Sequence, residues 1–460
     1  MGKSTSGSKE YFFTHDKAFY KSLFSMLIVV SLQNIVAFSV NMTDNIMLGA
    51  YNQEALSGAT TVNQIFFLVQ QFSMAIGSAL IILTSQYWGK EKTQPICILT
   101  GIALKFSLAL DFIFVFICSL CPAEILHLFT DSKEIVAQGV AYLSLLKWTF
   151  IFFIISNTLI CMLRSVQTVK IAFYISIISF IVNASINYVL IFGKFGFPEM
   201  GVTGSAIGTF IARLLEVIIV VIYLWKFDKK LHLFKHKFFF SSDKKLALDY
   251  RKVATPLIIC QIFWAISIPM QTAILGHLSD DAIAANSVAI TFFQYLKVIV
   301  VAFTSVASVM IGNAIGQGDM KKIRSDARSM TFIVVIIGII LAISLFLLRY
   351  PLLSMYNLSY EATNLSLNLI IVMSIVMVGM SYQLPVSTGI IQGGGDTQFV
   401  MRMNLISIWV IVMPLSFLSA FVWHFPIEWV VLIIQSDQIF KGIPTFIRFR
   451  SYRWIRKLAK

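Results

Sequence analysis

The residue of this sequence best suited to chemistry is an acid inside an apolar segment. Asp44 is the only charged residue between positions 22 and 49. Because an ionised side chain is costly in hydrocarbon, an acid retained there is a candidate functional residue. Asn34 and Asn41 precede it by ten and three positions, so the three side chains share one stripe of a helix. Facing a polar cavity, Asp44 could bind a proton or a cation, with Asn34 and Asn41 lining that cavity; the alternative is an aspartate hydrated at the end of its segment.

A second polar pair lies further along the chain. Asn183 and Asn187 are four positions apart, so their side chains lie on the same face of a helix. Amide carbonyl oxygens bind hard cations, although with less electrostatic help than a carboxylate gives. If the ion bound by the protein is sodium, we expect Asp44, Asn183 and Asn187 to be its ligands.

These residues must be carried by helices that cross a membrane. Of the 460 residues, 58% are hydrophobic and only 13% are charged, whereas a soluble domain has roughly 25% charged residues. This excludes a soluble enzyme and a nucleic-acid binder, despite the net charge of +14. A spanning helix needs about 20 mostly apolar residues. The predicted segments are 22–49, 60–87, 96–120, 137–162, 171–193, 203–226, 256–278, 287–313, 329–349, 364–391, 403–423 and 426–440.

The positions of lysine and arginine predict the orientation, because basic loops stay on the cytoplasmic side of a membrane. Alternate loops are strongly basic, including Lys90 and Lys92 and the central stretch after position 226. Both termini are therefore expected in the cytoplasm, and the basic linker is expected to contact lipid headgroups. The predicted organisation is a cytoplasmic segment 1–21, an N-lobe 22–226, a basic cytoplasmic linker 227–255, a C-lobe 256–440 and a basic tail 441–460.

The two halves of the chain repeat. At an offset of 227 positions, Ser78 corresponds to Ser305, Gln86 to Asn313 and Gly89 to Gly316. This offset indicates two pseudo-symmetric six-helix bundles, an arrangement associated with alternating access to a site near the bilayer midplane. The predicted fold class is an all-α integral membrane protein with about twelve spanning helices.

Several motifs resemble the MATE family, the multidrug and toxic compound extrusion transporters. They are NMTDNIMLGA (41–50), LTSQYWGKEK (83–92), INYVLIFGKFGFPEMGVTGSAIGTFIARLLE (186–216), IGNAIGQGD (311–319), IIQGGGDT (390–397) and the tail 436–458. The resemblance implies a bacterial secondary transporter in the cytoplasmic membrane. It would export organic, usually cationic compounds in exchange for protons or sodium ions. A monomer with no cofactor besides the coupling ion is expected.

The resemblance also implies site residues. One branch of the family has an asparagine followed by an aspartate where this chain has Asn183 and Asn187, so one negative charge is missing. Thr209 and Asn157 resemble the remaining polar members of that cluster; the alternative is that they hydrogen-bond between helices. A second branch has acids in spans seven and ten, and this chain has none there. The residues expected to line the cargo cavity in those spans are Trp264, Gln271, Tyr382 and Gln383.

Three lysines lie near the middle of predicted spans: Lys105, Lys147 and Lys297. Each is expected to face a cavity or a partner acid such as Asp111, and in the cleft they would favour a zwitterionic or anionic cargo. A flippase for lipid-linked saccharides, which shares the two-lobed architecture, is the alternative function. An enzyme is disfavoured because the histidines form no catalytic or metal-binding pair.

Overall fold

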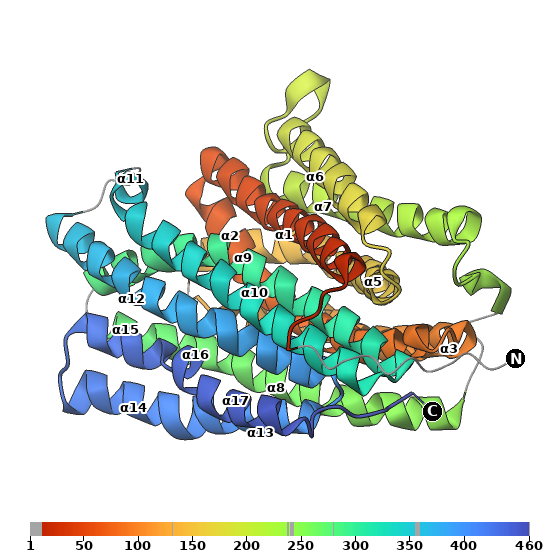
Figure 1. Ribbon diagram of the computed structural model, residues 1–460. Helices are drawn as coiled ribbons and strands as arrows, with labels where there is room; N and C mark the ends of the chain where they lie inside the picture. Colours follow the sequence, from red (N-terminus) through yellow and green to blue (C-terminus); the bar gives the residue numbers. More distant parts are fainter. Residues whose placement is uncertain are drawn as a thin grey trace, which may run out of the picture. The chain divides into compact units, whose positions relative to one another are not determined.

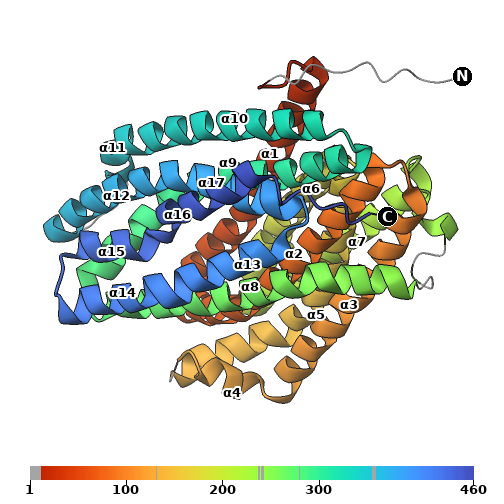
Figure 2. The same ribbon diagram turned by 60° about the horizontal axis from the view of Figure 1, so that its bottom comes forward.

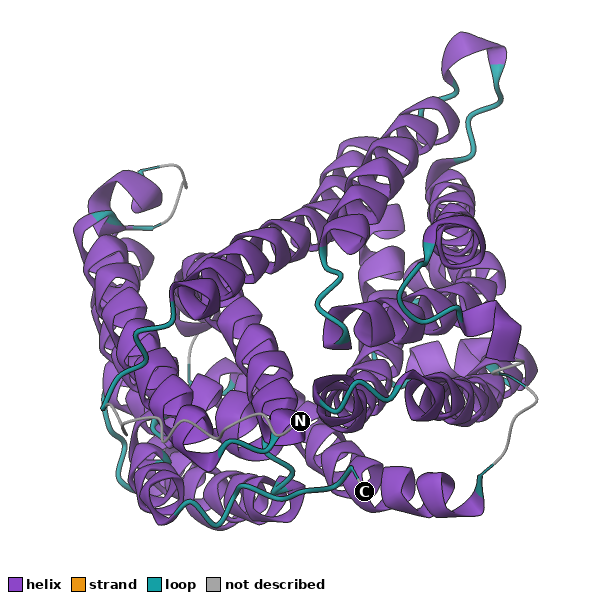
Figure 3. Cartoon of the chain, turned by 45° about the vertical axis from the view of Figure 1, so that its right-hand side comes forward, coloured by secondary structure: helices purple, strands orange, loops and turns teal. Residues whose placement is uncertain are grey.

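The computed structural model describes residues 12–130, 132–236, 239, 243–278, 280–354 and 359–459, apart from the side chains of residues 280, 281, 283 and 284. Every regular element in these ranges is helical (Figure 3), which confirms the all-α prediction. About half of the predicted segment 1–21 lies outside the described residues, as do residues 237, 238 and 240–242 of the predicted linker.

The first half of the described chain contains seven α-helices and three short helices of other types. They are α1 (Lys17–Tyr51), α2 (Gln53–Gly89), α3 (Thr93–Leu120), α4 (Pro122–His127), α5 (Lys133–Ser165), α6 (Lys170–Ile191), η1 (Lys194–Gly196), α7 (Gly201–Ile222), η2 (Tyr223–Phe227) and η3 (Leu233–His236). Within this half, α6 and α7 run side by side (Figure 1).

In the second half of the described chain, the helices are divided into more and shorter segments. Its elements are α8 (Lys244–Gly276), α9 (Asp280–Gln317), α10 (Met320–Leu347), α11 (Arg349–Leu353), α12 (Tyr360–Leu384), η4 (Pro385–Ile391), α13 (Thr397–Leu405), η5 (Ile406–Val412), α14 (Met413–Phe417), η6 (Leu418–Val422), α15 (Ile427–Gln435), α16 (Asp437–Phe440) and α17 (Gly442–Ser451). The segments η4, η5 and η6 are π-helical, and they lie at or beside Pro385 and Pro414, where a proline removes a backbone donor. From α13 to η6 the chain still forms one continuous rod (Figure 2).

Twelve helical segments of the described chain are long and apolar enough to cross a membrane, in agreement with the predicted spans. Two boundaries differ from the predicted ones by more than ten residues. The seventh begins at Lys244, inside the predicted linker, because Leu246, Tyr250 and Val253 are buried on one side of α8. The twelfth continues to Ser451 rather than ending at residue 440, so the predicted tail is helical over most of its first half.

The described residues form two compact units, each with its own apolar core. One comprises the described residues within 1–31, 85–90 and 263–460, and the other comprises 32–84 and 91–262. The core of the first includes Met373, Val376 and Met377, whereas the core of the second is built around Leu143 and Phe150. These units do not coincide with the ranges 22–226 and 256–440, and the predicted lobe boundaries stay a prediction.

The sequence repeat reappears as a reciprocal helix contact within the first unit. A Cβ on Gly89 would overlap the carbonyl oxygen of Asn313, and a Cβ on Gly316 would overlap the carbonyl oxygen of Gln86. Residues related by the offset of 227 therefore exchange equivalent contacts, as in a self-complementary two-fold interface. Only glycine lets the ends of α2 and α9 approach so closely.

The C-terminal residues bind to Asp396 and to the end of α2, in the same unit. Asp396 is fully buried and forms ion pairs with Arg448 and Arg456, the latter at 2.7 Å. The side-chain oxygen of Gln86 accepts hydrogen bonds from the backbone nitrogens of Leu458 at 2.8 Å and Ala459 at 3.2 Å. The motif GGGDT thus contains an acid, Asp396, that binds the tail, and Gly395 beside it has a φ of +100°.

The glycine contact predicts a sharp steric effect. We expect Gly89→Val to destabilise the protein by about 1–3 kcal/mol, because a side chain at this crossing forces the two backbones apart. Thermal unfolding in detergent measures the change. Gly442→Ala is the matched control, because its Cβ would meet only ordinary contacts with Tyr382 at 3.6 Å. Equal unfolding temperatures for the two variants would contradict the close crossing.

Candidate functional site

The candidate site lies within the second unit, where α1 meets α6 and α7. Asp44 is 8% exposed, and Asn183 and Asn187 on α6 are 1% and 0% exposed. The Nδ2 of Asn187 donates a hydrogen bond to Oδ1 of Asp44 at 2.6 Å. A bond this short to a carboxylate is charge-assisted and stronger than one between neutral groups. The predicted acid and the predicted amide pair are therefore brought together.

The hydrogen bonds continue from Asn187 into α7. The same Nδ2 lies 3.4 Å from Oδ1 of Asn183, and the Nδ2 of Asn183 donates to Oγ1 of Thr209 at 3.4 Å. Three predicted residues on two helices thus extend the polar contact of Asp44. The Oδ1 of Asn187 is buried without a hydrogen-bond partner in the described chain. Side-chain oxygens that could ligate a cation are therefore gathered here, although only one carboxylate is among them.

A glycine that sequence reasoning missed makes room for this arrangement. A Cβ on Gly208 would overlap Oδ1 of Asn187. The amide of Asn187 consequently lies against the backbone of α7, beside Thr209. The only signal in the sequence was a glycine inside a helix, which lowers helix stability and is retained where packing needs it.

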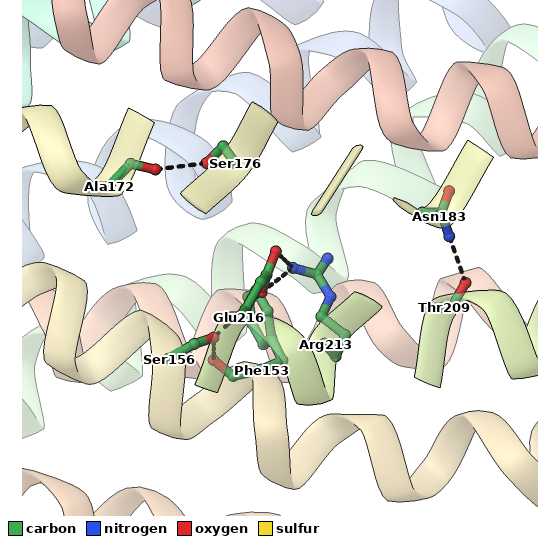
Figure 4. Close-up of polar contacts among 8 residues, drawn as sticks. All are labelled: Phe153, Ser156, Ala172, Ser176, Asn183, Thr209, Arg213 and Glu216. Carbon is green, nitrogen blue, oxygen red and sulfur yellow. Dashed lines mark hydrogen bonds and ion pairs between the residues drawn. The ribbon is translucent and has the colours of Figure 1, made fainter. Parts of the chain in front are cut away.

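An ion pair follows one turn further along α7. Arg213 binds Glu216 through two hydrogen bonds of 2.9 and 3.1 Å, and Glu216 accepts a weaker one from Ser156 at 3.4 Å. Figure 4 shows this pair beside the contact between Asn183 and Thr209. The guanidinium also lies 5.0 Å from the ring centre of Phe153. Arg213 follows Thr209 by four residues on α7, so its charge lies on the same face of that helix as the cluster.

The other residues predicted for this half lie outside the hydrogen-bonded cluster. Asn157 donates to Oγ of Ser73 at 2.7 Å, which matches the alternative of a bond between helices. Asn34 is half-buried and Asn41 is exposed. Neither makes a hydrogen bond to another described residue.

The predicted cavity residues of the second half have varied surroundings. Trp264 packs on the core of the first unit, and Gln271 is half-buried. The amide of Gln383 at the end of α12 donates to Oγ of Ser387 in η4 at 3.0 Å. The hydroxyl of Tyr382 is buried without a hydrogen-bond partner among the described residues.

The prediction that Asp111 is a partner acid for the mid-span lysines is wrong. Asp111 is fully buried, and neither of its oxygens has a hydrogen-bond partner in the described chain. The ammonium of Lys105 instead lies 5.5 Å from the ring centre of Phe239, and that of Lys147 lies 5.7 Å from that of Trp148. Aromatic faces attract cations at such distances, so these two lysines are accommodated without an acid.

With the geometry described, comparisons identify the family. The family model MatE matches residues 30–189 and 256–418. The chain belongs to the MATE family. It is 22% identical over 407 residues to the probable multidrug resistance protein YoeA of Bacillus subtilis, covering 86% of each chain. It is 25% identical over 421 residues to the probable multidrug resistance protein NorM of Xylella fastidiosa strain 9a5c, covering 87% of this chain and 88% of that one.

A solved structure supports the fold. The Vibrio cholerae MATE transporter VcmN, crystallised as a point mutant, superposes with a TM-score of 0.85 at 16% identity, covering 96% of this chain and 98% of that one. This MATE-family chain is therefore a multi-pass membrane protein of a transporter family, with two pseudo-symmetric bundles of six helices.

The role of Gly208 can be tested by a double-mutant cycle. We expect Gly208→Ala to lower stability by about 1–3 kcal/mol, because the new methyl group overlaps the Asn187 amide. Asn187→Ala frees that space, so the double variant should lose less stability than the two single losses combined. Thermal unfolding in detergent provides the readout, and strictly additive losses would contradict the packing.

The ion pair on α7 gives a second prediction. Removing one partner of a buried pair leaves an uncompensated charge and costs about 3–5 kcal/mol. We expect Glu216→Gln to be strongly destabilising and the double variant Arg213→Gln/Glu216→Gln to recover part of the loss. Unfolding temperatures in detergent measure both, with Glu428→Gln, whose acid only accepts an exposed hydrogen bond from Asn368, as the control. A double variant less stable than Glu216→Gln would refute this interpretation.

Proposed function

We propose that this MATE-family transporter exports organic compounds in exchange for a proton or a sodium ion, which binds at Asp44. The observation that carries the proposal is the 2.6 Å hydrogen bond from Asn187 to Asp44, buried where three helices meet. The names of the relatives YoeA and NorM, both probable multidrug resistance proteins, support an efflux role.

The geometry supports a mechanism in which ion binding changes how α1 is held. While Asp44 is ionised, its oxygen accepts the Asn187 hydrogen bond and ties α1 to α6. A proton or a sodium ion neutralises the carboxylate and weakens that acceptor. Since the ion binds one arrangement better than the other, loading shifts the equilibrium between inward-open and outward-open forms. The cargo acts on the same equilibrium and needs no direct contact with the ion.

The choice between the two ions depends on Asn187. A proton needs one acceptor oxygen, whereas sodium needs several, supplied by Asp44, Asn183 and Asn187. Sodium binding would recruit Oδ1 of Asn187, which has no partner in the described chain. The cluster of Asp44, Asn183, Asn187 and Thr209 contains one carboxylate, so a sodium site formed by it would have a single carboxylate ligand.

The remaining parts of the proposal concern cargo and location. We propose an organic cation as the main cargo, moved outward across a bacterial cytoplasmic membrane by a monomer with both termini in the cytoplasm. The excess of basic residues in alternate loops supports that orientation.

Reconstitution in liposomes tests this function. A fluorescent organic cation is loaded, and a proton gradient or a sodium gradient is imposed separately. We expect export under one of the two gradients. We expect Asp44→Asn to reduce that export by about 100-fold, because an amide has neither the negative charge of a carboxylate nor its ability to take up a proton.

The matched control is Asp111→Asn, which alters another buried acid outside the cluster and should leave gradient-driven export within about twofold of the wild type, since Asp111 has no hydrogen-bond partner to lose. Export by the wild type under neither gradient, or full gradient-driven export by Asp44→Asn, would overturn the proposal.

A further inference from the structure

A small cavity lies in the first unit, where α17 meets the start of α13. Its volume is about 290 Å³, which is at the lower end of the range for small-molecule sites. The lining combines basic and polar side chains with apolar ones: Phe399, Pro444, Ile447, Arg448, Ser451 and Arg453. A ligand of this cavity must therefore be small where it enters, and it must match both kinds of surface.

Two arginines form the basic side of the cavity. Arg448 is oriented by Asp396, which accepts a hydrogen bond from its Nε at 2.7 Å, and by the ring of Phe399, whose centre lies 5.3 Å from the guanidinium carbon. The ion pair with Asp396 uses Nε and Nη2 of Arg448, so its Nη1 can donate to a ligand. Arg453 is exposed, and no described residue forms an ion pair or a hydrogen bond with its guanidinium.

Positive charge is in excess around the cavity. The carboxylate of Asp396 is shared by Arg448 and Arg456, so one negative charge faces two guanidinium groups. Arg453 adds a further positive charge that no acid of the described chain pairs with. The planar guanidinium of arginine matches the oxygens of a phosphate group, to which it can donate two parallel hydrogen bonds. A phosphate is therefore the anion that suits this side of the cavity.

The cavity lies where two membrane-spanning segments end. Ser451 is the last residue of the span Ile427–Ser451, and Phe399 is near the start of the span Thr397–Val422. Because both residues line one cavity, these two ends lie at the same membrane surface. At that depth the hydrocarbon core gives way to the layer of phospholipid headgroups, so lipid phosphate groups surround the cavity.

An exposed apolar stripe continues from the cavity along α17. Ile447 lines the cavity, and Ile443 lies one turn earlier on the same face of the helix. These two residues are 65% and 68% exposed, and Phe446 is 48% exposed. Four residues of helix correspond to about 6 Å, so the stripe extends from the cavity toward the middle of the membrane. The acyl chains of a phospholipid can pack on this stripe, whereas a soluble phosphate gains nothing from it.

We propose that this cavity binds the headgroup of one anionic phospholipid. Arg453 and Nη1 of Arg448 donate to its phosphate, and its acyl chains lie along Ile447 and Ile443. Basic pockets between spanning helices bind anionic headgroups in this way. Because Arg448 also binds Asp396, to which Arg456 of the tail is paired, the bound lipid holds the C-terminal segment at the membrane surface. The site depends neither on the coupling ion nor on the cargo.

Lipid binding to the full chain tests this site. The probes are phosphatidylglycerol and phosphatidylcholine with identical acyl chains, added to delipidated protein in detergent, and native mass spectrometry gives the number of bound lipids and their affinities. We expect one phosphatidylglycerol to bind about tenfold more tightly than phosphatidylcholine, as for a hydrogen bond between charged groups. Arg453→Gln should remove this preference, and Arg453→Lys should retain most of it. Arg453 is exposed, so both variants are expected to fold.

The matched control is Arg450→Gln, which removes an exposed arginine three residues earlier. The guanidinium of Arg450 lies over the ring of Phe446 and does not line the cavity. Exposed charges contribute little, so we expect the control to keep the preference within about twofold of the wild type. Glycerol 3-phosphate at the same concentration as the lipid should not displace it.

Three outcomes would overturn the proposal. The first is an equal affinity of the wild type for the two lipids. The second is an equal loss of preference in Arg453→Gln and Arg450→Gln, because the arginines would then act only through the charge of the whole surface. The third is displacement of the lipid by glycerol 3-phosphate, which would indicate a site for a soluble anion.

Discussion

A carboxylate buried between helices is the constraint on which the site depends. Burying such an ion costs several kcal/mol, whereas one hydrogen bond to a charged group returns about 1.5–3 kcal/mol. The bond from Asn187 therefore compensates the burial of Asp44 only in part. A carboxylate whose desolvation is only partly compensated by hydrogen bonds gains free energy when it binds a cation. This incomplete compensation is what makes Asp44 suitable for ion binding rather than for structure alone.

That requirement extends into the packing of the surrounding helices. Asn187 can reach Asp44 only if its amide lies flat against α7, and Gly208 provides the space. The same amide also donates to Asn183, which in turn donates to Thr209. Because each partner is on a different turn or helix, a small shift of α1, α6 or α7 alters the hydrogen bond to Asp44. Local geometry and ion affinity are therefore linked through the same few contacts.

The spanning helices and most of the residues around Asp44 could be predicted from the sequence. The length of an apolar segment predicts a spanning helix, and a spacing of four residues predicts that two side chains share one face of a helix. Asp44, Asn183 and Asn187 follow from those two rules, and Thr209 follows from the family resemblance. The connection of Asp396 with Arg448 and Arg456 could not be predicted, since no periodicity links residues so far apart. The helix through Asp437 was underestimated for a related reason: hydropathy counts an acid as unfavourable, although Lys441 one turn later neutralises it. For Asn157 the resemblance left two interpretations open, and its hydrogen bond to Ser73 on α2 agrees with the alternative of a contact between helices.

The balance of charge around Asp44 bears on what the site can bind. The carboxylates of Asp44 and Glu216 and the guanidinium of Arg213 carry one net negative charge between them. Buried charges are most stable when paired, so one proton or one sodium ion would bring this group to neutrality. A second cation would leave it positive, and the proposed exchange would therefore use one monovalent ion per cycle at this site.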